Sequence, residues 1–315
     1  MRFAWVGGHA EGIPALSALL EAGAPIQAVL TLRPDLAAKR SSIADYGPVC
    51  EQFRVPLHFI ANINEVDTCR ILSGIEPDVV FVIGWHQIVR PATLRRARIG
   101  MIGAHASMLP HNRGSAPINW ALIRGERETG STLYWLSDHI DAMRIIDQTA
   151  FPITLYDTCA TLYQQVALSN REMLLRLLPR LMAGERPGRP MPFAGEPALR
   201  RRRPADGGID WSWTSIGVYD FIRALTRPFS GAFAKLDGQT WWIWHAGVSP
   251  AMQANAPPGT VLAPVVSPVD DACGQQVACG KGCVVLLEVQ DESGHVLRGR
   301  ALSEQPWTGK VWEMG

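Results

Sequence analysis

The chain has 315 residues, 47% of them hydrophobic and 19% charged, which is typical of a globular protein large enough for two domains. Its 30 basic and 29 acidic residues give a net charge of +1, so charge gives no general reason to expect a nucleic-acid or membrane partner. No apolar run reaches the roughly 18 residues that a membrane span needs, and no signal peptide is expected.

The six cysteines favour a reducing compartment. They include no CxxC pair, and no histidine cluster lies near them, so ligand spacing argues against a zinc site. We therefore expect thiols that pack as small apolar side chains, no bound metal, and a cytoplasmic location.

The first half of the chain alternates predicted strands and helices. The strands are expected over 3–6, 26–32, 56–60, 79–83 and 99–105, and the helices over 9–22, 41–53 and 66–73. The run Val79–Ile83 is apolar throughout, as a strand covered on both faces requires. A late strand pair over 129–136 and 144–151 and a helix over 158–183 complete this half. The alternation predicts an α/β fold with a Rossmann-like, doubly wound, mainly parallel sheet.

A second, smaller domain is expected after a stretch rich in Pro, Gly and Arg. It begins with a helix over 214–225, and short β segments follow over 232–236, 239–246, 259–262, 284–288 and 296–298, a pattern that suits a small barrel. We expect a first domain over 1–190, a linker over 191–208 and an OB-like C-terminal domain over 209–315. The run Arg200–Arg203 is more typical of a solvated face or docking strip than of a nucleic-acid patch.

Three glycines, Gly7, Gly8 and Gly12, follow the first strand. Their spacing is GGxxxG rather than the GxGxxG of dinucleotide-binding folds, and no ribose-binding acid follows the second strand. A tight strand-to-helix turn is the favoured interpretation.

His105 ends a predicted central strand, where open α/β sheets place their sites, and a loop containing Ser107 and Pro110 follows it. Asp141 lies on the loop between the late strands. A carboxylate paired with an imidazole raises the pKa of the imidazole and fixes its tautomer, which suits proton transfer near neutral pH. The alternative is a structural histidine. The segment 84–89 is expected to line the same sheet edge, or else to be an ordinary loop whose Trp85 packs on the core.

The segment His105-Ala-Ser-Met-Leu-Pro-His-Asn-Arg-Gly114 resembles the folate-dependent formyltransferases, with Ala116–Trp120, Gly125–Thr132 and Gly208–Trp211 following in the family's order. That family includes methionyl-tRNA formyltransferase, the glycinamide ribonucleotide enzyme and the sugar N-formyltransferases. The resemblance covers nearly the whole chain. Where the family's loop begins Asn-x-His, this chain has Gly103-Ala-His105.

The resemblance implies transfer of a formyl group from 10-formyltetrahydrofolate, or another one-carbon tetrahydrofolate, to an amine. It implies that His105 transfers the proton and that Asp141 raises the pKa of His105. The two loops that would hold the folate consist of Gln87, Ile88, Val89, Ser137, Asp138, His139, Ile140 and Asp141.

Two departures from the family pattern concern the chemistry. Gly103 stands where the family's asparagine stabilises an oxyanion, and losing one such donor typically costs about 10²–10³ in turnover. Met143 replaces a family glycine close to Asp141. Asn112 and Asn119 are the amides that could substitute for the missing one.

The expected acceptor is a small-molecule amine, such as an amino sugar nucleotide or an amino acid derivative. The chain lacks the Arg/Lys-rich insertion of the tRNA enzyme, and its near-neutral charge argues against phosphate contacts with nucleic acid. Methionyl-tRNA formyltransferase and a catalytically degenerate folate-binding paralogue stay open as alternatives, and a homodimer stays open as the assembly.

Overall fold

The computed structural model describes residues 1–38, 41, 43–138, 143–192, 195, 197–248 and 255–315. The chain forms two compact units, and it passes between them more than once. The sheet unit comprises 1–117, 128–152 and 163–199, and the C-terminal unit comprises 118–127, 153–162 and 200–315.

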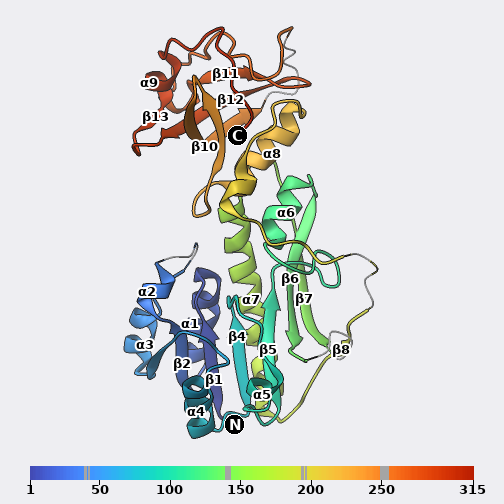
Figure 1. Cartoon of the computed structure of the whole chain (residues 1–315). Coiled ribbons are helices and arrows are strands. Elements are labelled where there is room, and N and C mark those ends of the chain that lie inside the picture. The colour runs from blue at the N-terminus through green and yellow to red at the C-terminus, as the bar shows by residue number, and fades with distance from the viewer. Residues whose placement is uncertain (39–40, 42, 139–142, 193–194, 196, 249–254) are drawn as a thin grey trace. The chain divides into compact units, whose positions relative to one another are not determined.

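The sheet unit is built on an eight-stranded sheet in the order β3-β2-β1-β4-β5-β6-β7-β8 (Figure 1). The first five of these strands run parallel and the last three antiparallel. The strands are β1 (Phe3–Gly7), β2 (Ile26–Leu32), β3 (Leu57–Ile60), β4 (Val79–Ile83), β5 (Gly100–His105), β6 (Glu128–Trp135), β7 (Arg144–Pro152) and β8 (Arg189–Pro190). The order reverses between β1 and β4, and open α/β sheets bind ligands at the carboxyl ends of strands at such a point.

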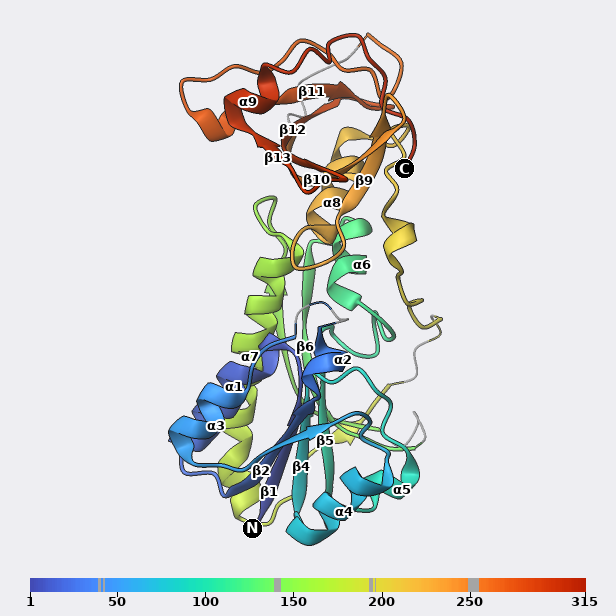
Figure 2. The same cartoon turned by 60° about the vertical axis from the view of Figure 1, so that its left-hand side comes forward.

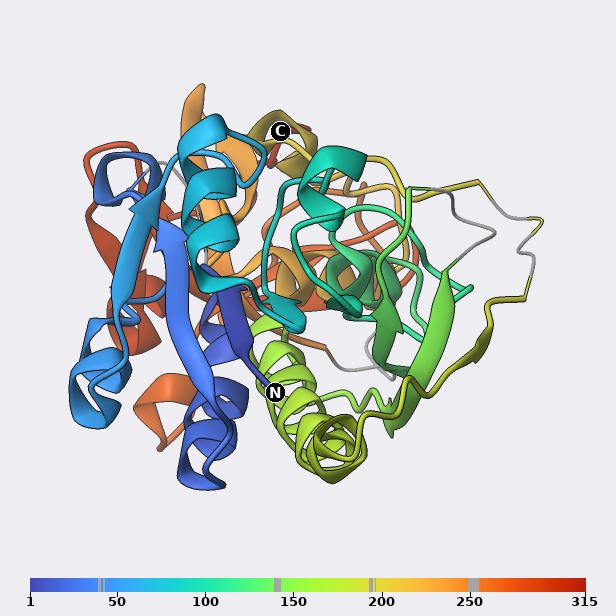
Figure 3. The same ribbon diagram turned by 90° about the horizontal axis from the view of Figure 1, so that it is seen from below.

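Helices cover both faces of this sheet, as the views in Figures 2 and 3 show. The helices of the unit are α1 (Ile13–Glu21), α2 (Pro34–Ala37), α3 (Gly47–Phe53), α4 (Val66–Ile75), α5 (Pro91–Leu94) and most of α7 (Cys159–Met182), with a 3₁₀ turn over Ala10–Gly12. Side chains of α1, α3 and α7 pack on one face of the sheet, and side chains of α4 and α5 pack on the other. Within the described ranges, no helix is both long and apolar enough to cross a membrane.

Alternation along β4 divides the core between the two faces. Phe81 and Ile83 belong to one buried cluster, and Val80 and Val82 belong to the other. Successive side chains of a strand point to opposite faces, so a strand buried on both faces must be apolar at every position. The prediction of a mainly parallel, doubly wound sheet is confirmed.

The Gly-Gly turn after β1 is tight because a tyrosine fills the space beneath it. A Cβ atom on Gly7 would lie 2.6 Å from the Tyr46 hydroxyl oxygen, and one on Gly12 would clash with the same atom. That hydroxyl donates to the backbone carbonyl of His9 at 2.8 Å. Gly7 and Gly12 therefore make room for the Tyr46 side chain.

The helix predicted over 41–53 is wrong in its first part, because α3 begins only at Gly47. The Asp45 carboxylate accepts a hydrogen bond from the Gly47 backbone N–H at 2.8 Å, and Pro48 occupies the first turn. Asp and Pro favour a turn and a helix start at these positions, so the helix cannot extend backwards.

The C-terminal unit holds a five-stranded antiparallel sheet in the order β11-β12-β10-β9, with β13 also paired to β12. Its strands are β9 (Ala232–Leu236), β10 (Gln239–Val248), β11 (Gln275–Ala278), β12 (Cys283–Asp291) and β13 (Val296–Arg298). Its helices are α6 (Pro117–Ile123, from its second residue), α8 (Ser215–Leu225) and α9 (Gly299–Ser303), with 3₁₀ turns over Pro204–Gly207 and Asp270–Ala272. The predicted smaller β domain is confirmed.

The strand predicted over 259–262 is wrong: this segment makes only isolated bridges, and β11 is the strand that prediction missed. Thr260 bridges Val311, and Val261 bridges Val277. The partner changes between adjacent residues, so no continuous ladder forms.

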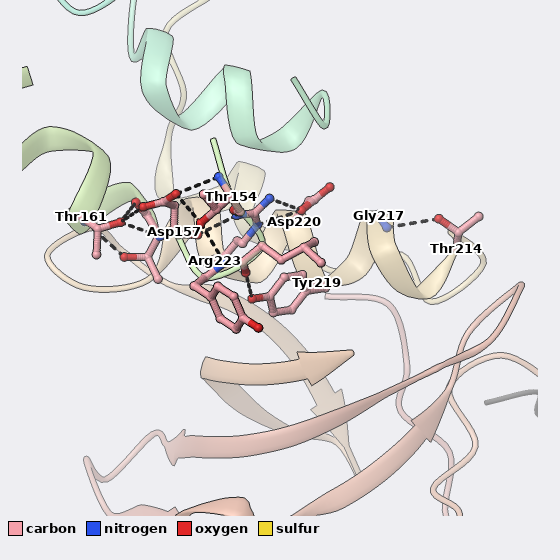
Figure 4. A network of polar contacts seen from close by, with 11 residues as sticks. Thr154, Asp157, Thr161, Thr214, Gly217, Tyr219, Asp220 and Arg223 are labelled. Carbon is pink, nitrogen blue, oxygen red and sulfur yellow. Dashed lines mark hydrogen bonds and ion pairs between the residues drawn. The ribbon is translucent and has the colours of Figure 1, made fainter. Parts of the chain in front are cut away.

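α8 contains a buried ion pair whose arginine also bonds the segment that precedes α7 (Figure 4). The Arg223 guanidinium lies 2.7 Å from an Asp220 carboxylate oxygen, and the two side chains are only 7% and 6% exposed. Arg223 also donates to the carbonyls of Thr154 and Asp157 at 2.6 and 2.7 Å. Burial opposes ionisation of Asp157, but hydrogen bonds from Thr154 and Thr161 and the charge of Arg223 hold its pKa below the ordinary value.

Two further bonds in Figure 4 support this network. The Tyr219 hydroxyl donates to the Leu155 carbonyl at 2.5 Å, and the Thr214 hydroxyl caps α8 by accepting from the Gly217 N–H at 3.1 Å. Because the segment 153–162 is bonded to α8 in this way, it belongs to the C-terminal unit although it lies far away in sequence.

Replacing Arg223 with Met should lower the free energy of unfolding by about 3–5 kcal/mol, because the Asp220 charge is left buried without a partner. Urea or thermal unfolding measures the change. The double variant Arg223→Met/Asp220→Leu should regain most of the loss, since it leaves no unpaired charge.

Arg300→Met is the matched control. Arg300 belongs to the same unit but pairs with Asp270 at 3.9 Å, and both side chains are 61% exposed. Loss of such a pair costs about 0–1 kcal/mol. Equal effects of the two arginine substitutions would refute a special role for the buried pair.

Candidate active site

His105 ends β5 at the carboxyl edge of the sheet, two strands from β1. Its Nε2 lies 3.0 Å from the backbone carbonyl oxygen of Asn112. A carbonyl can only accept, so Nε2 carries the hydrogen and a neutral ring has its lone pair at Nδ1. Burial lowers the pKa of His105 and outweighs the opposite effect of the Asn112 carbonyl. The imidazole is therefore neutral at pH 7 and able to accept a proton.

A threonine hydroxyl on β6 holds the loop that follows His105. Thr132 pairs with His105 across the two strands and is fully buried. Its hydroxyl donates to the Ser107 carbonyl at 2.7 Å and accepts from the Leu109 N–H at 3.0 Å. The Gln148 amide donates to the same hydroxyl at 3.0 Å. Thr132 is not among the residues predicted for the site, although its position directly before the buried Leu133 places its side chain on the other face of β6.

Gly114, in the same loop, lies where the backbone at Leu199 passes too close for any side chain. It has a φ of +118°, and a Cβ atom there would lie 2.5 Å from the backbone nitrogen and oxygen of Leu199. Leu199 donates to the Arg113 carbonyl at 2.7 Å and accepts from the Ser115 N–H at 3.1 Å. Only glycine fits this crossing.

The loop after β4 is tied to the loop after β3 by two amide side chains. Gln87 donates to the Ala61 carbonyl at 2.9 Å and accepts from the Ile63 N–H at 2.8 Å. Asn64, which is not among the predicted site residues, donates to the Ile88 carbonyl at 2.8 Å. The Gln87 side chain is thus engaged within the protein, while the side chain of Ile88 is 87% exposed.

The loop after β6 begins beside β5. The Leu136 N–H donates to the Met101 carbonyl at 2.8 Å, and the Ser137 hydroxyl donates to Asp138 at 3.2 Å. The next predicted site residues, His139, Ile140 and Asp141, lie outside the described residues. The pairing of His105 with Asp141 therefore stays a prediction. In the described part of the chain, no cluster of three or more His, Cys, Asp or Glu side chains could hold a metal ion.

Gly103 pairs with Tyr134 across β5 and β6. A Cβ atom on Gly103 would lie 2.8 Å from Leu136 Cδ2 and 3.3 Å from both Cζ and the hydroxyl oxygen of Tyr134. The side chains of Tyr134 in β6 and of Leu136, which follows β6, thus occupy the space beside the glycine. Asn119, one of the two amides considered as a substitute, donates instead to the Ala224 carbonyl at 2.6 Å within the C-terminal unit.

Glu11 lies in the turn after β1, next to the end of β4. A Cβ atom on Gly84 would lie 3.1 Å from Glu11 Cγ and 3.4 Å from its Oε1. Burial raises the pKa of Glu11 from 4.5 to about 7, and among the described residues its carboxyl group has no hydrogen-bond partner. This edge of the sheet therefore holds a carboxyl group that changes charge near neutral pH.

The raised pKa of Glu11 predicts a loss of stability as pH rises. Folding favours the protonated form, so this contribution is complete below pH 4.5 and is lost as pH rises through about 7. Glu11→Gln should match the wild type at pH 4.5 and exceed its free energy of unfolding by up to about 3 kcal/mol at pH 8, at about 1.4 kcal/mol for each pH unit. Urea unfolding at both pH values measures this. The exposed Glu21→Gln, on the following helix, should leave the pH dependence unchanged; a wild-type curve for Glu11→Gln would contradict the prediction.

Known structures share this fold at low sequence identity. HypX from Aquifex aeolicus, solved with tetrahydrofolic acid, is 18% identical with a TM-score of 0.64, covering 95% of this chain and 46% of its own. The chain thus spans about half the length of HypX. The N-formyltransferase from Helicobacter canadensis, solved with folinic acid and dTDP-3-aminofucose, is 16% identical with a TM-score of 0.64, covering 90% of this chain and 98% of its own.

A further structure, the sugar 3N-formyltransferase WlaRD solved with dTDP and 5-N-formyl-tetrahydrofolate, is 15% identical with a TM-score of 0.63 and covers 93% of this chain and 98% of its own. At the level of sequence families, the formyl transferase pattern matches residues 18–178. The pattern of the formyl transferase C-terminal domain matches residues 202–305. The sequence matches extend over both halves of the chain and include the His105 loop, and the chain belongs to the formyl transferase family.

Proposed function

We propose that this protein transfers a formyl group from 10-formyltetrahydrofolate to the amine of a small molecule. The observation that carries the proposal is His105, a neutral imidazole at the carboxyl end of β5 whose Nε2–H is held by the Asn112 carbonyl. Membership of the formyl transferase family indicates the class of reaction, and His105 can carry out the proton transfer that this reaction needs.

His105 acts as the general base and then as the general acid. The Nδ1 atom takes the proton that the attacking amine must lose, and it gives the proton to the departing folate nitrogen. The hydrogen bond at Nε2 keeps the ring in the tautomer that leaves Nδ1 able to accept. Asp141, from the loop after β6, is proposed to assist by stabilising the protonated ring.

The folate ring is proposed to bind between the loops after β4 and β6. Ile88 offers an exposed apolar side chain, and hydrogen bonds of Gln87 and Asn64 tie its loop to the loop after β3. Ser137 and Asp138 offer polar groups at the end of β6. An apolar surface beside a few fixed polar groups suits a flat, partly polar ring system. The structures solved with tetrahydrofolic acid and formylated folates support this choice of donor.

The acceptor is proposed to be a small amine, such as an amino sugar nucleotide or an amino acid derivative. The likeness to two sugar formyltransferases over almost all of their own length supports it. The net charge of +1 offers no surplus of cations for a polyanionic nucleic acid.

The proposal is tested by mixing the purified protein with 10-formyltetrahydrofolate and a panel of amino sugar nucleotides and amino acids, and following release of tetrahydrofolate. Formyl transfer to at least one amine is expected. His105→Ala should lower turnover by about 10²–10⁴, because the general base is lost. Calorimetry should show that this variant binds folinic acid within a few-fold of the wild type.

His245→Ala, at an exposed histidine of β10, is the matched control and should keep wild-type turnover. Wild-type turnover in His105→Ala would show that another group transfers the proton. Formylation of initiator tRNA with none of the small amines would replace the proposed acceptor with nucleic acid.

A further inference from the structure

The space beside Gly103 is filled by the side chain that faces it across the sheet. Gly103 and Tyr134 are directly opposite each other on β5 and β6, and the next pair along the same face is His105 with Thr132. Diagonal neighbours on one face of an antiparallel pair lie about 7–8 Å apart, within reach of an aromatic side chain. Tyr134 is therefore on the same face of the sheet as His105 and one pair away from it.

The Tyr134 hydroxyl lies beside the position where a side chain at residue 103 would begin. It is 3.3 Å from the position of a Cβ atom on Gly103. This contact is already tighter than an ordinary van der Waals distance, so an asparagine at residue 103, whose amide carbon is one bond beyond Cβ, would crowd the Tyr134 phenol. Leu136, 2.8 Å from the same Cβ position, restricts the space further.

The hydroxyl is available as a donor. Tyr134 is partly buried, and within the described residues its hydroxyl has no hydrogen-bond partner. Burial raises the pKa of Tyr134 to about 12, so the phenol keeps its proton throughout the pH range of an enzyme assay. A partly buried hydroxyl without a partner loses hydrogen bonds to water, and a ligand oxygen could restore them.

We propose that Tyr134 is a catalytic residue whose hydroxyl donates a hydrogen bond to the formyl oxygen, in place of the amide that Gly103 lacks. The proposal rests on the proposed function. The glycine at position 103 then leaves room for a different hydrogen-bond donor, the hydroxyl of Tyr134 on the neighbouring strand β6.

The chemistry balances without consuming Tyr134. The acceptor nitrogen forms a bond to the formyl carbon, and the bond between that carbon and the folate nitrogen breaks. The proton of the amine passes through His105 to the folate nitrogen. Negative charge grows on the formyl oxygen between these events, and the Tyr134 hydroxyl stabilises it while keeping its own proton.

Tyr134→Phe removes only the hydroxyl and tests the proposal. Turnover should fall by about 10²–10³ with KM for the folate nearly unchanged, because the charge on the oxygen appears only during the reaction. Infrared spectra of bound ¹³C-formyl folinic acid give a second readout. The carbonyl band should lie at lower frequency in the wild type than in Tyr134→Phe, since a hydrogen bond weakens the C=O bond.

Tyr156→Phe makes the same chemical change at a tyrosine that is 92% exposed, and it should alter neither turnover nor the carbonyl band. Gly103→Asn is the opposite test. If Tyr134 supplies the donor, the added side chain displaces it and lowers turnover. If residue 103 merely lacks a donor, the asparagine raises turnover above the wild type and the proposal for Tyr134 is overturned.

The outcomes separate the two proposals. Wild-type protein that transfers formyl groups while Tyr134→Phe does so equally well, with the same carbonyl frequency, overturns the role of Tyr134 and leaves the proposed function standing. Wild-type protein that binds no folate overturns both.

Discussion

The pairing of β5 with the antiparallel strand β6 is the constraint on which the candidate site depends. It sets Thr132 opposite His105 and Tyr134 opposite Gly103. The first pair fixes the conformation of the loop after His105, because the buried Thr132 hydroxyl bonds the backbone of Ser107 and Leu109. The second pair places the Tyr134 ring and hydroxyl beside Gly103. A shift of β6 by one residue in this register would turn the side chains of Thr132 and Tyr134 to the face opposite His105.

Several glycines are explained by neighbouring groups that lie where a Cβ atom would be. These glycines include two that resemble a ligand-binding motif and one that replaces a family asparagine. Gly7 and Gly12 admit the Tyr46 phenol, and Gly114 admits the backbone at Leu199. Gly103 lies against Tyr134 and Leu136 in the same way. In each case the absent side chain is matched by another group that fills its volume, as close packing of protein interiors requires.

Burial also decides the ionisation of groups at the sheet edge. The same loss of solvation that keeps His105 neutral keeps Glu11 protonated up to about pH 7. In the C-terminal unit the buried carboxylate of Asp220 has a partner: burial raises its pKa, and the ion pair and hydrogen bond with Arg223 oppose that rise. Backbone carbonyls accept the further hydrogen bonds of Arg223. Charge at the sheet edge is therefore sensitive to pH, whereas the pair in the C-terminal unit is structural.

Local pattern predicted most of the architecture. The unbroken apolar run of β4, the alternation of strands with helices and the short β segments of the second half were enough for a mainly parallel sheet and a smaller β domain. Sequence also indicated the His105 loop and the family. It failed where a few polar residues decide the start of an element, as at Asp45 and Pro48 before α3.

What the sequence by itself determined is which residue types are present and which strand or loop carries each of them. The tertiary structure decided which residues meet: Tyr134 beside Gly103, Thr132 beneath the His105 loop, and Asn64 across from Ile88. These contacts join residues from different strands and loops, many positions apart in the chain. Their geometry is set by the register of the whole sheet, and no local pattern of hydrophobic and polar residues records that register.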